Sequence, residues 1–372
     1  MPEKPETILI VSPDESVIRF LGALLKDTNF SLIKPREAGA VPAEVKRLNP
    51  TMAILDADHM PTARLMDLCR ILADNPIPVF LVTRDAERSR QTTAKGLSIG
   101  AVDVLALPGG APKLSPEERR RMIKAISAGA ALNVSPVSYN SAIRIVKEIG
   151  MEAETGPAAG NFDALSLKRR FDAVGVAIST GGPNALSHLI PLLPADFPVP
   201  MLIVQHIIPD FINGIVARLN QNCSVSVKIA EQREPLAPGV VYFAPDKTHL
   251  MVKNIGGRLY THLSAEPSDL LFCPSADVLF KSMAEVCGPR CMAVIMTGMG
   301  RDGVDGVRCV KKAGGATMAQ DSHSSVIYGM ARVAVDAKLI DRVVPLDRIA
   351  GEVYRLMAEE AAGHSKNESV SS

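Results

Sequence analysis

The sequence has few of the features that mark membrane, secreted or nucleic-acid-binding proteins. No apolar run is long enough to cross a bilayer, and residues 1–6 carry no apolar core of a signal peptide. The 41 lysines and arginines nearly balance the 40 aspartates and glutamates, for a formal net charge of +1. Charge therefore gives no reason to expect nucleic-acid binding. We expect a cytoplasmic protein that neither inserts into a membrane nor binds nucleic acid.

Cysteines in metal-binding spacing are also missing. Cys287 and Cys291 are separated by three residues instead of the usual two, and no pair of histidines lies nearby. The six cysteines are scattered, mostly among apolar residues: Cys69, Cys223, Cys273, Cys287, Cys291 and Cys309. We therefore expect buried, reduced thiols, and neither a metal nor a cofactor.

What the sequence does contain is an apolar run of strand length that stops abruptly. Residues 174–178 are apolar, and Ser179, Thr180 and two glycines follow before a stretch with helical spacing begins beyond Pro183. A strand that turns at once into a helix leaves the turn at the carboxyl edge of a sheet, where ligands bind in open α/β folds. A hydroxyl at that edge is either a nucleophile or a phosphate ligand.

Two later runs end in the same manner. Residues 201–204 are apolar and are followed two positions later by His206, and residues 293–296 lead into a glycine-rich turn that carries Asp302. Continuous apolar runs separated by helical segments are typical of parallel strands buried on both faces. Because parallel strands end on one side of a sheet, we expect Ser179, His206 and Asp302 to converge.

These three residue types are the set that a serine hydrolase needs. A serine hydroxyl is a poor nucleophile at neutral pH unless a base takes its proton, and a carboxylate that orients the base improves it. Ser179 would be the nucleophile, His206 the base and Asp302 the orienting carboxylate. Their order along the chain differs from the Ser-Asp-His order of α/β-hydrolases, which implies a convergent arrangement.

Several motifs of this half of the chain resemble those of the chemotaxis protein-glutamate methylesterases (CheB). The likeness covers roughly residues 173–349, and the motifs follow the family's order along the chain. They are residues 174–184, 205–206, 274–280, 297–303 and 328–330.

The resemblance implies an α/β esterase that hydrolyses glutamyl methyl esters on the cytoplasmic helices of methyl-accepting chemoreceptors; many such enzymes also deamidate receptor glutamines. It assigns the nucleophile to Ser179, the base to His206 and the orienting carboxylate to Asp302. It also implies that Thr180 helps to orient the histidine and that the main chain of Met299 lies at the oxyanion site. A chemosensory histidine kinase is a second candidate partner.

The front of the chain alternates between apolar runs of strand length and stretches with helical spacing. The runs are residues 8–11, 52–55, 79–82 and 102–105. This rhythm is typical of a doubly wound α/β domain. It resembles the receiver domain of response regulators, which precedes the esterase in the family, and the resemblance places a candidate phosphoacceptor at Asp56.

Several substitutions argue against ordinary receiver chemistry. Phosphoryl transfer to an aspartate needs Mg²⁺, held by oxygen ligands, and a cation beside the phosphate. The family's acidic pair falls on Ser12 and Pro13, and its lysine falls on Leu107. We interpret the domain as a pseudo-receiver with a regulatory or docking role. The alternative is a weakly working receiver that uses Asp14 and Asp56.

The organisation predicted from the sequence is two doubly wound α/β domains with mainly parallel sheets. The predicted segments are a receiver-like domain at residues 1–127, a linker at 128–170, a methylesterase domain at 171–360 and a disordered tail at 361–372. Within the esterase domain, we expect residues 225–229 and 240–244 to form a β excursion. His249 is expected in a substrate-side or structural loop, and His323 on a surface loop.

Two other functions fit parts of the pattern. The turn at residues 179–182 resembles a phosphate-binding turn of a nucleotide-binding module, although no lysine follows the glycines as a P-loop requires. The degenerate front domain also fits a catalytically silent scaffold of a chemosensory pathway. The intact set of serine, histidine and aspartate favours the esterase over both.

Overall fold

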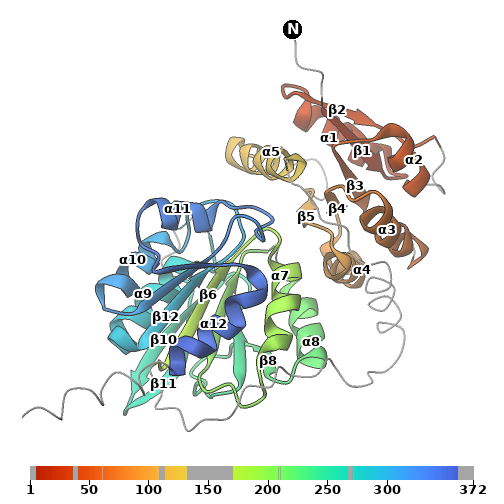
Figure 1. Ribbon diagram of the computed structural model, residues 1–372. Helices are drawn as coiled ribbons and strands as arrows, with labels where there is room; N and C mark the ends of the chain where they lie inside the picture. The colour runs from red at the N-terminus through yellow and green to blue at the C-terminus, as the bar shows by residue number, and fades with distance from the viewer. Residues whose placement is uncertain are drawn as a thin grey trace, which may run out of the picture. The chain divides into compact units, whose positions relative to one another are not determined.

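The computed structural model describes residues 6–36, 41–60, 62–108, 114–131, 171–207, 209, 211–266, 270 and 272–358. The chain divides into two compact units, each of which is described by itself (Figure 1). Nearly all of the predicted linker and the whole predicted tail lie outside the described residues. Within the described part of the chain, no helix combines the length and the apolar character needed to span a membrane.

The described residues of the first unit form a five-stranded parallel sheet in the order β2-β1-β3-β4-β5. Its strands are β1 (Glu6–Val11), β2 (Phe30–Ile33), β3 (Met52–Asp56), β4 (Val79–Thr83) and β5 (Asp103–Ala106). Its helices are α1 (Glu15–Leu25), α2 (Val41–Leu48), α3 (Thr62–Asp74), α4 (Ala86–Ile99) and α5 (Pro116–Ala130). The doubly wound prediction is confirmed. β2 was missed because it is a short edge strand with no fully buried residue.

Helix α5 shows how the sequence fixes one boundary of this unit. The Ser115 hydroxyl accepts the N–H of Glu118 at 3.2 Å, and the Glu118 carboxylate accepts the N–H of Ser115 at 2.8 Å, which is a capping box. Pro116 follows at the first helical position, where its missing N–H costs nothing. The helix ends at Ala130, three residues beyond the predicted domain boundary at 127.

The described residues of the second unit form a seven-stranded parallel sheet in the order β14-β13-β12-β6-β7-β9-β8. Its strands are β6 (Ala173–Ile178), β7 (Met201–Gln205), β8 (Ser226–Ile229), β9 (Val240–Phe243), β12 (Cys291–Ile295), β13 (Ala316–Gln320) and β14 (Arg342–Val344). β8 and β9 correspond to the predicted β excursion, but β9 pairs in parallel with β7 and β8 pairs in parallel with β9, so both extend the main sheet. The excursion from the sheet is instead the antiparallel pair β10 (His249–Ile255) and β11 (Arg258–Ser264).

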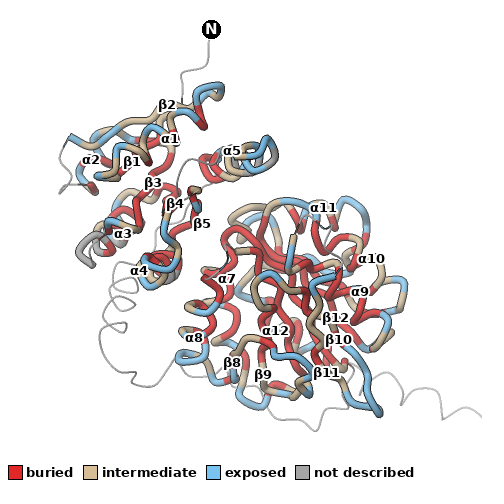
Figure 2. Tube along the Cα trace, turned by 180° about the vertical axis from the view of Figure 1, so that it is seen from behind, coloured by how far each residue is buried: buried red, intermediate tan, exposed pale blue. Residues whose placement is uncertain are grey.

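Helices cover both faces of this sheet, as the uninterrupted apolar strands predict. They are α7 (Gly182–Leu189), α8 (Ile212–Asn222), α9 (Ala276–Cys287), α10 (Val304–Lys312), α11 (Met330–Asp336) and α12 (Leu346–Ala358), with 3-10 turns at Ile190–Leu192 and Gly288–Arg290. α9 and α10 pack on one face, and α7 and α12 lie on the other (Figure 1). The central strands run through the buried interior between them (Figure 2).

The cysteine expectation is only partly met. Cys287 and Cys291 are buried free thiols, and burial raises the pKa of Cys287 to about 12 and that of Cys291 to about 11. Cys273, in contrast, is an exposed free thiol. It precedes Pro274 in an irregular segment, so an apolar sequence context did not predict burial there.

The strand order places a topological switch point at the centre of the second sheet. From β6 the chain continues to β7 on one side, and it later returns to β12 on the other side of β6. The loops that leave β6 and β12 therefore diverge, which opens the carboxyl edge of the sheet at this point. The predicted serine, histidine and aspartate follow the three strands that meet there.

Close packing of β6 on α9 gives a test of this core. A Cβ added at Gly175 would lie 2.7 Å from Met283 Sδ and 2.8 Å from Phe280 Cε1. We expect Gly175→Ala to lower the free energy of unfolding by about 1–3 kcal/mol. Four of the five tyrosines, Tyr242, Tyr260, Tyr328 and Tyr354, belong to this unit, so tyrosine fluorescence during urea unfolding reports mainly on it. In the matched control Gly351→Ala, nothing lies within 4 Å of the new Cβ in α12, and a gain of roughly 0.5–1 kcal/mol is expected. Equal effects of both changes would contradict this packing.

Candidate active site

Ser179 and His206 leave neighbouring strands in register. Ile178 pairs with Gln205 as the last pair of β6 and β7, and the His206 N–H donates to the Ile178 carbonyl at 2.9 Å. The Ser179 N–H donates to the Thr297 carbonyl at 3.0 Å on the opposite side. Ser179, His206 and the segment after β12 therefore lie side by side at the carboxyl edge, as predicted.

Asp302 comes from the loop between β12 and α10 and meets the histidine directly. Its Oδ2 lies 2.8 Å from His206 Nε2, and both side chains are buried. Burial raises the pKa of the Asp302 carboxyl, but the hydrogen bond and charge of His206 and donors from Ala276 and Ser275 lower it more. The net pKa lies below its ordinary value of 3.8, so the carboxylate is charged at neutral pH.

The N-terminus of α9 supplies those further donors. The Ser275 hydroxyl donates to Asp302 Oδ1 at 2.7 Å, the Ala276 N–H to Oδ2 at 2.7 Å and the Asp277 N–H to Oδ1 at 3.1 Å. N–H groups of a first helical turn have no partner within the helix and carry partial positive charge. Both carboxylate oxygens are thus held by fixed groups, and the direction of Oδ2 toward His206 is set.

The other ring nitrogen of His206 is buried and makes no hydrogen bond to a described residue. Nδ1 has no hydrogen-bond partner among the described residues, and the Ser179 hydroxyl is not bonded to it. Phe272 stacks on the imidazole, with ring centroids 4.4 Å apart and planes 10° apart. Because Nε2 is committed to Asp302, Nδ1 is the nitrogen able to accept a proton from a neighbouring hydroxyl.

A side-chain amide ties the serine and histidine turns together. Gln205 Nε2 donates to the Ser179 carbonyl at 3.0 Å and to the His206 carbonyl at 2.8 Å. On the other side of the serine, a Cβ at Gly298 would lie 2.5 Å from Ser179 Cβ, so only glycine lets this loop pass so close. The backbone that carries Ser179 is therefore fixed from both sides.

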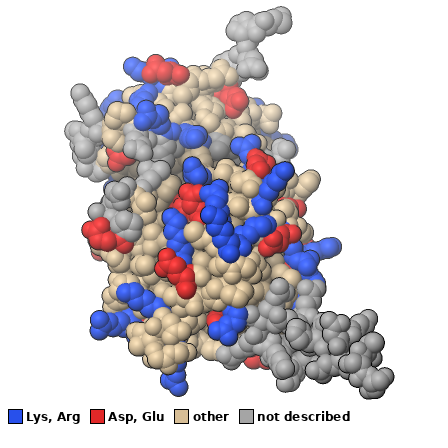
Figure 3. Space-filling view, turned by 90° about the vertical axis from the view of Figure 1, so that its left-hand side faces the viewer, with Lys and Arg blue, Asp and Glu red and all other residues tan. Residues whose placement is uncertain are grey.

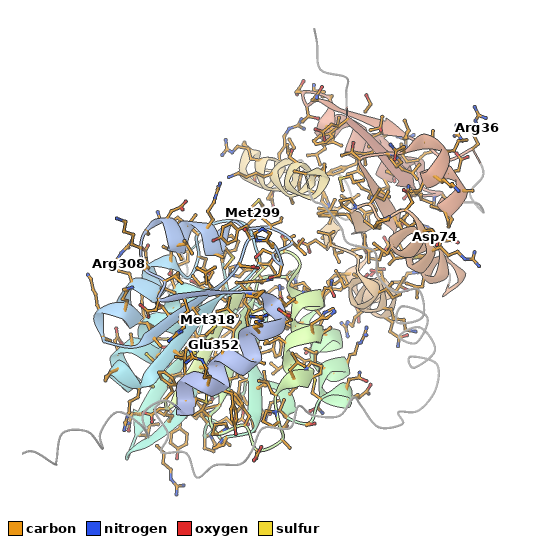
Figure 4. All side chains as sticks on the ribbon, viewed as in Figure 1. Arg36, Asp74, Met299, Arg308, Met318 and Glu352 are labelled. Atoms are coloured by element: carbon orange, nitrogen blue, oxygen red, sulfur yellow. The ribbon has the colours of Figure 1, made fainter. Side chains whose placement is uncertain are left out.

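Thr180 and Met299 lie at the same edge. The Thr180 carbonyl accepts a hydrogen bond from the Thr297 hydroxyl at 2.9 Å, which joins the turn after β6 to the loop after β12. Met299 belongs to that loop and lies at the end of the sheet (Figure 4). No described group accepts a hydrogen bond from its main-chain N–H. The roles predicted for both residues remain predictions.

Sequence reasoning missed four groups of this site. Gln205 and Ser275 stood in the quoted motifs without a role, and Phe272 gave no signal. His249 was expected in a loop, but it is the first residue of β10, is completely buried and accepts the Ser275 N–H on Nδ1 at 3.1 Å. Apart from the bond between Gln205 and the adjacent His206, their partners lie far away in sequence, so no local pattern identifies these contacts.

Comparisons with known proteins show the family to which the chain belongs. Residues 174–353 match the family model described as CheB methylesterase. The chain is 36% identical over 358 residues to protein-glutamate methylesterase/protein-glutamine glutaminase 4 of Myxococcus xanthus, covering 95% of this chain and 97% of that protein. The chain belongs to the CheB methylesterase family. The prediction of an esterase of this family is thereby confirmed.

Other CheB relatives extend over both units. The protein-glutamate methylesterase/protein-glutamine glutaminase 1 of Oleidesulfovibrio alaskensis is 32% identical over 362 residues, covering 92% of this chain and 97% of that protein. Among solved structures, the crystal structure of the Thermotoga maritima CheB methylesterase catalytic domain is 35% identical, covering 50% of this chain and 98% of that chain, with a TM-score of 0.49.

In the first unit of this chain, the carboxyl edge of the sheet holds a different set of hydrogen-bonded groups. Asp56 is buried, and its Oδ2 accepts the Ser12 hydroxyl at 2.5 Å and lies 3.0 Å from His59 Nδ1. Its Oδ1 accepts the N–H of Asp58 at 3.0 Å. A pocket lies beside it, lined by Val11, Ser12, Pro13, Pro35, Leu55, Asp56 and His59. Ser12 thus donates a hydrogen bond to the Asp56 carboxylate and does not supply a second carboxylate beside it.

The carboxylates at this edge of the sheet do not fit a magnesium site. Asp14 caps α1, where its Oδ1 accepts the Ser16 hydroxyl and, at 2.8 Å, the Ser16 N–H; the bond from the hydroxyl and then that from the N–H lower the pKa of Asp14. Asp58 accepts the Thr83 hydroxyl and, at 2.7 Å, the N–H of Arg84. The described residues contain no cluster of three or more His, Cys, Asp or Glu side chains able to hold a metal.

Charges of both signs share the surface of the molecule. Lysines and arginines alternate with acidic side chains on the face that Figure 3 shows. On α10, Arg308 lies 2.6 Å from Asp305, and Lys311 lies 2.9 Å from Asp341. Such exposed pairs contribute little to stability. This face therefore has no large area of one sign.

The lowered pKa of Asp302 predicts a specific pH dependence. A carboxylate with a lower pKa in the folded state stabilises that state above its unfolded pKa, and the contribution is lost as the pH falls through the folded value. We expect Asp302→Asn to lower the free energy of unfolding at pH 7 by roughly 1–3 kcal/mol. The difference from wild type should shrink as the pH falls below the ordinary carboxyl pKa of 3.8 and through the lower pKa of the folded state. Urea unfolding followed by tyrosine fluorescence measures it, and a difference independent of pH would contradict the assignment.

Proposed function

We propose that this chain is a serine hydrolase that demethylates methyl-glutamate residues on the cytoplasmic helices of chemoreceptors and deamidates glutamines at the same site. Membership of the CheB methylesterase family and the names of its relatives support the reaction. The single observation that carries the residue assignment is the state of His206. One ring nitrogen is bound to Asp302, and the other is buried and open beside the turn that bears Ser179.

The first half-reaction follows from this geometry. Ser179 Oγ attacks the γ-carbonyl carbon of the ester while His206 Nδ1 takes the hydroxyl proton. Asp302 accepts the Nε2–H and stabilises the imidazolium that forms. When the tetrahedral intermediate collapses, the C–O bond to the methoxy group breaks and Nδ1 returns the proton, which releases methanol and leaves a glutamyl ester on Ser179.

Water completes the cycle at the same nitrogen. Nδ1 takes a proton from a water molecule that attacks the glutamyl ester, and the collapse of this second intermediate returns the proton to Ser179 Oγ. Main-chain N–H groups of Thr180 and Met299 would stabilise the oxyanion of both intermediates, at roughly 3–4 kcal/mol per donor in comparable sites. With glutamine as substrate, ammonia leaves in place of methanol.

Replacing the nucleophile tests the proposal directly. We expect Ser179→Ala to abolish methanol release from methylated receptor signalling domains, because no other group in the mechanism attacks the ester. The melting temperature should change little, since the hydroxyl makes no hydrogen bond to another described residue. The matched control is Ser187→Ala in α7, whose hydroxyl bonds only the Pro183 carbonyl among the described residues. Full activity of Ser179→Ala, or equal loss of folding and activity, would contradict the assignment.

A serine-hydrolase probe separates this proposal from its two alternatives. Covalent labelling of Ser179 requires an activated hydroxyl, which neither a nucleotide-binding module nor a silent scaffold needs. The N–H of Gly182, at the end of the phosphate-type turn, already donates to the Ser179 carbonyl at 2.8 Å. The structural support for a phosphate site is therefore weaker than that for the hydrolase.

We also propose that the front domain is a pseudo-receiver that does not use aspartyl phosphorylation. An incoming phosphoryl group needs a free carboxylate oxygen to join, a metal and hydrogen-bond donors. Both oxygens of Asp56 already accept hydrogen bonds, and the Thr83 hydroxyl and the Arg84 N–H are bound to Asp58. These contacts support a regulatory or docking role over a weakly working receiver.

Acetyl phosphate provides the test of the front domain. After incubation with acetyl phosphate and Mg²⁺, we expect intact-mass measurements to show no phosphorylated species and the rate of methanol release to be unchanged. Ser12→Asp with Pro13→Asp, which restores the acidic pair, is the comparison for metal-dependent modification. Phosphorylation of wild type that disappears in Asp56→Asn would instead support the working receiver.

A further inference from the structure

A second histidine contacts the residues that hold the carboxylate of the candidate triad Ser179, His206 and Asp302. His249 is completely buried, and its Nδ1 accepts the main-chain N–H of Ser275 at 3.1 Å. The side chain of the same serine donates to Asp302 Oδ1 at 2.7 Å. His249 is therefore linked to the carboxylate through one residue, and through that carboxylate to His206.

Ser275 occupies the N-cap position of α9 without capping the helix. A serine at this position usually accepts an N–H of the first turn on its hydroxyl, but this hydroxyl makes no such bond. Asp302 takes that role and accepts the N–H groups of Ala276 and Asp277. The position of the carboxylate and the position of the helix start thus depend on each other.

His249 fixes the backbone at that junction. Because Nδ1 accepts an N–H, it carries no proton, and the proton of the neutral ring is on Nε2. Without this acceptor, the buried Ser275 N–H would lose its partner, and leaving a buried donor unpaired is unfavourable. β10 is joined to α9 again two turns further along the helix, where the Val252 N–H donates to the Ser282 hydroxyl at 3.0 Å. The histidine therefore comes from an element that is itself held against the helix.

We infer that His249 is a positioning residue for the hydrolase. By holding Ser275, it keeps three donors on Asp302 and so keeps Oδ2 directed at His206 Nε2. It touches neither substrate nor reacting atoms. This inference rests on the proposed function for its kinetic consequences, but its geometric content concerns the hydrogen bond between His206 and Asp302 and is measurable without substrate.

Two near-isosteric replacements separate the acceptor from the bulk of the ring. His249→Asn places an amide oxygen where Nδ1 lies, whereas His249→Gln carries its amide further out, toward the position of Nε2. We expect His249→Asn to keep kcat within about threefold of wild type. His249→Gln should lower kcat about tenfold or more, because Asp302 Oδ2 would no longer be held in its direction toward His206. A tenfold change corresponds to about 1.36 kcal/mol. KM should stay within about twofold in both, because the binding surface is unchanged. His323→Asn, on an exposed loop, is the control.

A spectroscopic measurement distinguishes failure of this inference from failure of the proposed function. The proton between His206 Nε2 and Asp302 gives a downfield NMR signal, assigned by its loss in Asp302→Asn. It should move or broaden in His249→Gln and in Ser275→Ala, and stay in place in His249→Asn and His323→Asn. If the chain releases no methanol at all, the proposed function fails while this comparison still decides the role of His249.

Three results would overturn the inference. The first is wild-type kcat and an unchanged downfield signal in a folded His249→Gln protein. The second is an equal loss of kcat in His249→Asn and His249→Gln, which would mark a residue needed only for packing. The third is strict additivity of His249→Gln and Ser275→Ala in kcat, since residues that act through one junction must couple. If His249→Gln does not fold, the smaller His249→Ala replaces it in all three comparisons.

Discussion

The candidate active site depends on one buried carboxylate that is held at the start of a helix. Removing Asp302 from water costs several kcal/mol unless its charge is matched by donors. The first turn of α9, the Ser275 hydroxyl and the His206 ring provide those donors, and together they lower the pKa of the carboxyl despite its burial. The same contacts that make burial tolerable also direct one oxygen at His206. Stability and catalytic geometry therefore have a common origin here.

The strand order explains why this carboxylate reaches the serine. β6 lies between β7 and β12, so residues after these three strands come together whatever the chain length between them. Gly298 lets the loop after β12 pass against Ser179, and Gln205 fixes the two turns on the other side. The switch point opens the carboxyl edge of the sheet. Gly298 and Gln205 fix the backbone of the turns as closely as a proton transfer between neighbouring side chains needs.

The sequence was sufficient for those features that repeat along the chain. Apolar runs that end in Ser179 and His206 predicted the central strands and the meeting point of the candidate residues, and the motifs predicted the family. The parallel pairing of β8 and β9 with the main sheet was not predictable, because short runs do not reveal their partner strand. The role of Ser275 was hidden for a similar reason: its partners lie 26 and 27 residues away, and nothing local requires either contact.

The two carboxyl edges of this chain, on sheets of the same kind, differ in which of their polar atoms already have hydrogen-bond partners. At the front edge, the oxygens of Asp56 and Asp58 accept hydrogen bonds from Ser12, Thr83 and main-chain N–H groups. At the back edge, the carboxylate is equally well bound, but the buried Nδ1 of His206 is not. Leaving a buried polar atom without a partner costs free energy, and such an atom can take up a proton without first breaking an existing bond. We therefore regard the open nitrogen, more than the presence of three residue types, as the observation that best supports the proposed hydrolase.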